Sequence, residues 1–294
     1  MHEHKLIAIL YHGGCPDGFG GAYAAFKKFG DTADYIPLKH GKPIPEHLEG
    51  KELYLIDFCY ARPQMDQLAA VAKSIVVLDH HEGVRDVATT FPGVFDTNRS
   101  GATIAWSYFH PDTPVPTLLQ YVEDGDLYRH TLPHAREILS YVYTLTNSFS
   151  SLETENVAQW DAFVSDIDTP ETFKRVVDIG TFFAQYHEHV VTRGVHRAEL
   201  VSFEGFECYL ASATGEFASD IGNQLARLKP PVAIIVSADA EGIRVSLRSD
   251  KSIDVAKIAQ KYGGNGHPAA AGFEIPYGDP IPWTPLPAHE DTRD

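Results

Sequence analysis

The sequence is poor in cysteine and has no long apolar run, and both scarcities exclude whole classes of protein. Its 294 residues include three cysteines, Cys15, Cys59 and Cys208, too few and too scattered for a disulfide framework or a zinc knuckle. No apolar run approaches the about 20 residues that cross a bilayer. The opening residues MHEHKLIAIL have neither the basic region nor the cleavage site of a signal peptide. We therefore expect a cytoplasmic protein in a reducing compartment, with no membrane partner.

Basic residues are also scarce. Lysine and arginine number 24 against 40 aspartates and glutamates, and the formal net charge is −16. A protein that binds long nucleic acid normally presents a basic groove, because neutralised phosphates supply most of the affinity. We therefore expect no long nucleic-acid partner, and any oligonucleotide ligand should be short. Some of the acidic residues are candidates for metal binding.

The first third of the chain alternates short apolar runs with helical patterns. This alternation predicts parallel strands joined by right-handed helical crossovers, the arrangement of an α/β domain. The chain is long enough for two domains. The expected strands are residues 5–11, 34–38, 53–56 and 74–78, and the expected helices are 18–29 and 62–73.

The later part of the chain predicts a helical segment followed by a second group of strands. We expect helices at 100–109 and 116–122, strands at 198–212, 232–248 and 273–275, and a helix at 252–262. The predicted domains are 1–131 (catalytic), 132–197 (helical connector) and 198–276 (C-terminal domain), with a disordered tail at 277–294.

Three of the expected strands end in side chains that bind metal ions. Ligands of open parallel sheets bind outside the carboxyl ends of the strands, so these side chains should converge. A single aspartate at a strand end is more often a turn or a cap. An aspartate followed by two histidines after a buried strand is costly to place there without a partner. The converging residues are His12, Asp17, Asp57, Asp79, His80 and His81.

These donors favour a particular kind of metal centre. Carboxylates and imidazoles without a thiolate cluster favour Mn²⁺, Mg²⁺ or Fe²⁺ over a structural zinc ion. Two such ions about 3.5–4 Å apart activate water and polarise a phosphoryl group. Asp57, at the end of a central strand, is the candidate bridging ligand. Asp124 or Asp126, in an acidic turn expected after a helix, could add one more carboxylate.

A glycine-rich segment, GGNGHPAAAG at 263–272, is the candidate substrate-binding element. Its glycines allow positive φ and close backbone approach, so that amide groups could surround an anion. A guanidinium at the end of a strand, that of Arg248, can bind phosphate with two hydrogen bonds. The alternative is a turn that only packs. The candidate binding residues are Arg248, Gly264, Asn265, Gly266 and His267.

These paired motifs resemble the DHH phosphoesterase superfamily. Asp79-His80-His81 with the upstream histidine and aspartates resembles its metal-binding motifs, and the glycine-rich segment resembles the GGGH-type C-terminal domain of the subfamily. That subfamily includes RecJ-type exonucleases, nanoRNase/pAp-phosphatases and cyclic-dinucleotide phosphodiesterases. The resemblance implies a doubly wound catalytic domain, a smaller mixed-sheet domain and dependence on Mn²⁺ or a similar ion.

The same resemblance implies a role for each matching residue. It implies that Asp79 and His81 orient ligands or contact phosphate, and that Arg248 and His267 hold substrate. The implied metal ligands are His12, Asp17, Asp57, His80 and Asp124, with Asp126 as the alternative to Asp124.

One position departs from the family pattern. The first motif of the family usually contains two acids, Asp-x-Asp, whereas this chain has Cys15-Pro16-Asp17. Aligning the following helix makes Asp17 the second acid and places Cys15 at the first. Cys15 then either replaces a carboxylate as a ligand, or one metal position is weakened or shifted toward a softer ion. In the alternative alignment Asp17 is the first acid and Phe19 stands at the second.

The predicted function is metal-dependent hydrolysis of a small phosphorylated substrate. The expected substrate classes are short oligonucleotides, pAp-like nucleotides and cyclic dinucleotides. Two alternatives remain open: an exopolyphosphatase-like phosphoanhydride hydrolase, and a non-catalytic ligand-binding relative. The sequence is compatible with both a monomer and a homo-oligomer.

Overall fold

The computed structural model describes residues 5–39, 41–145, 152 and 154–287. The chain divides into two compact units, Met1–Ala184 and Gln185–Asp294. The division lies inside α8 (Pro170–His196), within the segment predicted as a connector. Each unit is described on its own.

The first unit contains a five-stranded sheet in the order β2-β1-β3-β4-β5. All four strand pairs are parallel, which confirms the predicted parallel α/β domain. The short β5 was not predicted. The strands are β1 (Ile7–His12), β2 (Ala33–Leu38), β3 (Glu52–Ile56), β4 (Ser74–Asp79) and β5 (Gly93–Phe95).

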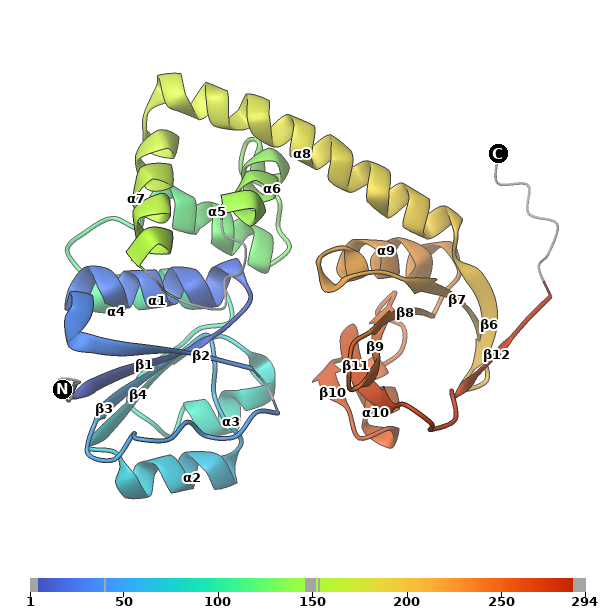
Figure 1. Cartoon of the computed structure of the whole chain (residues 1–294), viewed down its shortest axis with the longest axis horizontal. Coiled ribbons are helices and arrows are strands. Elements are labelled where there is room, and N and C mark those ends of the chain that lie inside the picture. Colours follow the sequence, from blue (N-terminus) through green and yellow to red (C-terminus); the bar gives the residue numbers. More distant parts are fainter. Residues whose placement is uncertain (1–4, 40, 146–151, 153, 288–294) are drawn as a thin grey trace. The chain divides into compact units, whose positions relative to one another are not determined.

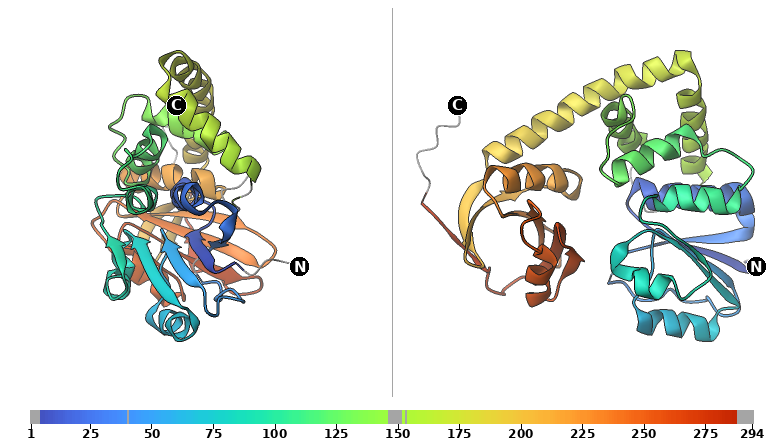
Figure 2. Two further views of the ribbon diagram at one scale, coloured as in Figure 1. Left: turned by 90° about the vertical axis from the view of Figure 1, so that its left-hand side faces the viewer. Right: turned by 180° about the vertical axis from the view of Figure 1, so that it is seen from behind.

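Helices cover both faces of this sheet (Figures 1 and 2). Successive side chains of a strand point to opposite faces, so β1 contributes Ile9 and Tyr11 to one core and Ala8 and Leu10 to the other. The sheet is therefore doubly wound, as predicted. One face carries α1 (Pro16–Phe29) and α4 (Gly101–Phe109), and the other carries α2 (Arg62–Val71) and the short α3 (Arg85–Ala88).

The helices after α4 pack onto the first unit. These are α5 (Thr117–Asp126), α6 (Ala135–Leu145), α7 (Thr154–Asp168) and the first part of α8. Trp160 of α7 is fully buried, with its ring centroid 5.0 Å from that of Phe19 in α1. Much of the predicted connector therefore belongs to the core of the first unit. The loop predicted near residues 148–151 lies outside the described residues.

One local prediction in this region was wrong. The segment EDGD, expected to form a turn after a helix, is the last part of α5. A Cβ atom at Gly125 would lie 2.5 Å from Leu139 Cδ1. The glycine is therefore required by the close approach of α6, and it does not end the helix.

The second unit contains a seven-stranded sheet in the order β10-β11-β9-β8-β7-β6-β12. The β7–β8 pair is parallel and the other pairs are antiparallel, which confirms the predicted mixed sheet. The strands are β6 (Glu199–Phe203), β7 (Phe206–Ser212), β8 (Val232–Ala238), β9 (Gly242–Ser249), β10 (Asn265–His267), β11 (Ala270–Pro276) and β12 (Trp283–Pro285).

Several details of the second unit differ from the sequence prediction. The single strand expected at 198–212 is a hairpin, because Glu204 and Gly205 adopt positive φ values of 53° and 84°. The glycine-rich segment contributes β10 and the start of β11, and helix α10 is Val255–Lys261. The predicted disordered tail contains β12, which pairs with β6, while residues 288–294 lie outside the description.

Helix α9 (Gly215–Leu228) was missed by the sequence analysis. Its partly or fully buried residues Phe217, Ile221 and Leu225 recur at helical spacing and pack against the second sheet. This periodicity was present in the sequence and could have identified the helix.

The packing of α7 predicts a large cost for truncating its buried tryptophan. Trp160→Ala should lower the free energy of unfolding of the first unit by about 3–5 kcal/mol, because it leaves a cavity beside Phe19. The shift should appear in urea or thermal unfolding. Phe182→Ala is the matched control, since the Phe182 side chain is 74% exposed. An equal effect of both variants would contradict the assignment of α7 to this core.

Candidate metal centre

The carboxyl ends of three adjacent strands bring the predicted residues together. His12 is the last residue of β1, Asp57 directly follows β3, and Asp79 is the last residue of β4. These strands are neighbours in the sheet, and crossovers from β1 and β3 pack on opposite faces. The side chains thus meet where a doubly wound sheet has its binding crevice.

Asp57 lies at the middle of the cluster and is 2% exposed. Its Oδ1 is 3.1 Å from His80 Nε2. Its Oδ2 is 3.4 Å from His12 Nδ1 and 3.5 Å from Cys15 Sγ. One carboxylate oxygen therefore faces each side of the cluster, as a bridging ligand requires.

The donors form overlapping groups whose ligand atoms all lie within 4.8 Å of one another. We call His12, Cys15 and Asp57 the Cys15 group, and Asp17, His80 and Asp126 the Asp126 group. A third group, Asp57, Asp79, His80 and His81, shares a residue with each of the others. Nitrogen and oxygen donors at this spacing fit two divalent cations held side by side.

Asp79 orients the two histidines that follow it. Its side chain is fully buried, and Oδ1 accepts hydrogen bonds from the backbone N–H groups of His80 (2.6 Å) and His81 (3.1 Å). The Nδ1–H of His81 donates to the same oxygen at 2.8 Å, which leaves Nε2 of His81 as the acceptor nitrogen. Asp79 Oδ2 is buried without a hydrogen-bond partner among the described residues, and a bound cation would satisfy it.

Asp17 is held by the N-terminus of α4. Its two carboxylate oxygens accept hydrogen bonds from Gly101 N (2.7 Å) and Ala102 N (2.9 Å). A Cβ atom at Gly101 would lie 2.5 Å from Asp57 Cβ, so only glycine fits between the two carboxylates. The sequence analysis did not identify Gly101, because its importance depends on this tertiary contact.

The structure separates the two acids of α5. Asp126 Oδ2 is 3.6 Å from His80 Nε2, whereas Asp124 belongs to none of the donor groups found among the described residues. Asp124 instead accepts hydrogen bonds from Thr131 N and Leu132 N and from the Thr131 hydroxyl. Asp124 therefore lies outside the donor groups, and Asp126, the alternative predicted ligand, lies within one of them.

Glu123 connects α5 to α4 and was also missed. Its Oε2 accepts hydrogen bonds from Ser100 N, at 3.1 Å, and from the Thr103 hydroxyl. Ser100 caps α4 through its own hydroxyl, which accepts from Thr103 N. These contacts fix the end of α5, and with it Asp126.

Burial and the charges of the centre shift the pKa values of its side chains. Burial and the nearby Asp57 charge raise the pKa of Asp17 well above its usual value and that of Asp126 to about 6. Burial acts against Asp57 as well, yet hydrogen bonds with His12 and His80 lower its pKa. Burial lowers the pKa of His80, but its hydrogen bond to Asp57 and the surrounding carboxylates outweigh this and raise it to about 9. Without cations, the cluster must retain protons.

This retention of protons predicts a pH-dependent metal affinity. His80 is protonated below about pH 9 and must lose its proton to coordinate, so Mn²⁺ affinity should rise with pH between about 6 and 9. Titration calorimetry at pH 7.5 in buffers of different ionisation enthalpy should show release of about one proton or more per chain. A binding enthalpy that does not change with the buffer would contradict the role of His80 as a metal ligand.

The two acids of α5 predict opposite phenotypes. Asp126→Asn should lower the Mn²⁺ content after equilibrium dialysis and leave thermal stability nearly unchanged. Asp124→Asn should lower the melting temperature, because it weakens the acceptors of Thr131 and Leu132, while Mn²⁺ content stays close to that of the wild type. The reverse pattern would restore Asp124 as the ligand.

The predicted substrate-binding residues lie in the second unit. Arg248 on β9 pairs with Ala270 on β11, which pairs with His267 on β10, so the three side chains share one face of the sheet. Arg248 is held by a hydrogen bond from Nη2 to Ser219 Oγ (2.9 Å) on α9. His267 is exposed. Arg248 and His267 therefore flank a small residue.

The glycines of this segment serve packing more than anion binding. The N–H of Gly264 donates to Ala259 O, and a Cβ atom there would lie 2.1 Å from Gly272 O. A Cβ atom at Gly266, whose φ is 151°, would clash with Ala271. The Gly264 amide, which was predicted to help surround an anion, is therefore already hydrogen-bonded within the protein. The side chain of Asn265 lies outside the description.

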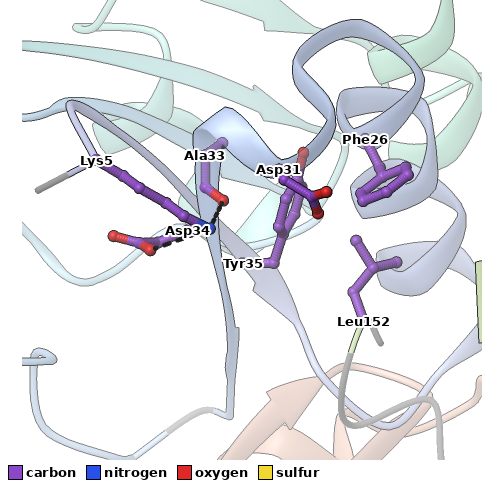
Figure 3. Close-up of a pocket in the computed structure, with 7 residues that line it drawn as sticks. All are labelled: Lys5, Phe26, Asp31, Ala33, Asp34, Tyr35 and Leu152. Carbon is purple, nitrogen blue, oxygen red and sulfur yellow. Dashed lines mark hydrogen bonds and ion pairs between the residues drawn. The ribbon is translucent and has the colours of Figure 1, made fainter. Parts of the chain in front are cut away.

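Two cavities are lined by other residues than those of the metal centre. The first, of about 320 Å³, borders β2 (Figure 3), where Lys5 donates to Ala33 O and pairs with Asp34. The second, of about 920 Å³, lies in the second unit between α8, β7 and α9, with Arg193 and Phe217 in its lining. Neither contains a residue of the three donor groups. A separate feature concerns the helices. None of the described helices is both long enough and apolar enough to cross a membrane.

Comparison with known proteins finds one domain match and several similar proteins. Residues 209–282 match the DHHA1 domain. The chain is 27% identical over 299 residues to the uncharacterized protein R106 of Acanthamoeba polyphaga mimivirus, covering 93% of this chain and 68% of that protein. Among solved structures, a DHH domain described as a member of a family of ribosomal proteins aligns with a TM-score of 0.60 and 13% identity, covering 92% of this chain and 83% of that one. The pGpG-specific phosphodiesterase PggH from Vibrio cholerae aligns with a TM-score of 0.47 and 16% identity over 93% and 94% of the two chains.

A doubly wound parallel domain followed by a mixed-sheet domain, with carboxylates and imidazoles at the strand ends, defines a two-domain α/β protein with a candidate metal centre. The DHHA1 match covers most of the second sheet, and Asp79-His80-His81 ends a central strand of the first. The second unit therefore matches the DHHA1 domain, and the strand-end motifs of the first unit resemble those of the DHH phosphoesterase superfamily.

Proposed function

We propose that this protein is a metal-dependent phosphohydrolase that acts on a small phosphorylated substrate. The observation that carries the proposal is the position of Asp57, whose two carboxylate oxygens face two different sets of donors. The DHHA1 match of the second unit and the resemblance of the first-unit motifs to the DHH phosphoesterase superfamily support hydrolysis of a phosphate ester or anhydride as the reaction.

The donor groups would hold two divalent cations, with Mn²⁺ as the leading candidate and Mg²⁺ or Fe²⁺ as alternatives. Such a pair lowers the pKa of water and stabilises negative charge on phosphate oxygens. Asp57 would bridge the ions, and Asp79 would hold the His81 ring in place through its Nδ1. The buried position of Asp17 and its two backbone donors would prevent that carboxylate from rotating away.

The substrate is proposed to be small. A surface with a net charge of −16 repels a long polyanion and leaves phosphate recognition to local cations. Arg248 and His267 supply such cations or donors on either side of Ala270, whose small side chain leaves room for a ligand. Short oligonucleotides, pAp-like nucleotides and cyclic dinucleotides fit these requirements.

Hydrolysis of a substrate panel tests the proposal. With Mn²⁺ present, the wild type should release phosphate or mononucleotide from at least one of a linear dinucleotide, pAp and a cyclic dinucleotide. Asp57→Asn should reduce this rate by on the order of a thousandfold or more, because it removes the bridging charge. Product formation would be followed by chromatography.

The panel also separates the alternatives. Activity restricted to polyphosphate or pyrophosphate would favour a phosphoanhydride hydrolase. No turnover of any substrate, together with binding of at most one ion per chain, would favour a non-catalytic ligand-binding protein. Full activity of Asp57→Asn would contradict the proposed bridging role. Asp34→Asn, which alters a carboxylate paired with Lys51 near β2, is the control for loss of a negative charge elsewhere.

A matched pair of variants tests the role of the second unit. Arg248→Lys keeps the charge but loses the two-pronged hydrogen bonding, and should raise KM by about tenfold with a smaller effect on kcat. Arg244→Lys, on the same strand, should leave both constants unchanged, because Arg244 pairs with Asp239 at an exposed position. Equal effects of the two substitutions would argue against a specific role for Arg248.

A further inference from the structure

Cys15 is positioned as a metal-binding group and not as an isolated thiol. Its Sγ lies 3.3 Å from His12 Nδ1 and 3.5 Å from Asp57 Oδ2. Together with His12 and Asp57 it forms the Cys15 group. The neighbouring Asp126 group consists of two carboxylates and one imidazole. The two halves of the centre therefore differ in chemical character.

We propose that the centre is built for two different cations. The Cys15 group, with sulfur, nitrogen and oxygen donors, selects a borderline-soft ion such as Zn²⁺, Co²⁺ or Fe²⁺. The Asp126 group, with nitrogen and oxygen donors alone, accepts a hard ion such as Mn²⁺ or Mg²⁺. The inference rests on the proposed function, because it assigns the metals of that same centre.

The difference follows from the preferences of the donors. Thiolates bind Zn²⁺ and other borderline ions strongly and Mg²⁺ or Mn²⁺ weakly, whereas carboxylate groups also suit the hard ions Mg²⁺ and Mn²⁺. As the sulfur–metal bond forms, the thiol proton passes to solvent. Asp57 belongs to the Cys15 group and directs its other oxygen to His80, so it can serve both ions. The remaining ligands of each ion then decide which cation it is.

A purely structural role of Cys15 explains less of the geometry. Cys15 is the N-cap of α1, and its Sγ accepts a hydrogen bond from Gly18 N at 3.3 Å. Serine or aspartate would perform this role at least as well. Capping also does not require the sulfur to face both His12 and Asp57. The cap and the ligand role are compatible, because a thiolate can accept a hydrogen bond while it binds a cation.

Cobalt spectroscopy tests the thiolate directly. Metal-free wild-type protein titrated with Co²⁺ should develop a near-ultraviolet sulfur-to-cobalt charge-transfer band that saturates at one equivalent of the ion. Cys15→Asp should lose this band and still bind two ions, because it keeps a ligand and the helix cap. Cys208→Ala, which removes a buried thiol of the second unit, should retain the band.

Metal competition gives a second, independent readout. After dialysis against equal Zn²⁺ and Mn²⁺, the wild type should retain at least one equivalent of zinc, measured by mass spectrometry of the metals. Cys15→Asp should shift the zinc-to-manganese ratio toward manganese by on the order of tenfold. Cys15→Ser, which preserves the cap but offers a weaker ligand, should lose the zinc equivalent without a lower melting temperature.

The outcomes separate this inference from the proposed function. Two bound Co²⁺ ions and phosphate release without a charge-transfer band would overturn the thiolate assignment and leave the hydrolase intact. A band that persists in Cys15→Asp would also overturn it. Failure of the wild type to bind any divalent ion would refute both proposals together.

Discussion

The structure of the candidate centre depends on one buried carboxylate. Asp57 interacts with His12 and Cys15 through one oxygen and with His80 through the other, at the carboxyl end of a central strand. A buried negative charge is tolerated only where it is paired. The surrounding histidines, and the cations proposed here, meet this requirement, and Gly101 leaves the space for the carboxylate to lie beside Asp17.

A supporting shell holds this arrangement rigid. Asp79 fixes the orientation of His81, backbone N–H groups of α4 hold Asp17, and Glu123 ties α5 to the same helix. The contacts of Asp17 and Glu123 join segments from different parts of the chain. The shell therefore couples folding of the first unit to assembly of the centre. Holding like charges close together costs free energy. Packing of the core of the first unit, to which Trp160 of α7 contributes, offsets this cost.

The second unit carries the residues proposed to recognise the substrate. Its sheet places Arg248 and His267 on one face with Ala270 between them, and α9 holds the guanidinium in place through Ser219. The glycines that resemble an anion-binding loop mostly permit tight strand pairing, as the contact at Gly264 shows. Specificity for a phosphorylated ligand is thus proposed to depend on side chains more than on a ring of amides.

The sequence by itself determined the parallel α/β domain, the convergence of His12, Asp57 and Asp79 and the mixed second sheet, because apolar runs of strand length and residues at strand ends are local signals. Only the tertiary structure distinguished Asp126 from Asp124, because their difference lies in which neighbours each meets on the same helix. Likewise, Gly101, Glu123 and the packing of α7 have no local signature. Long-range contacts decide such roles, and a sequence pattern does not record them.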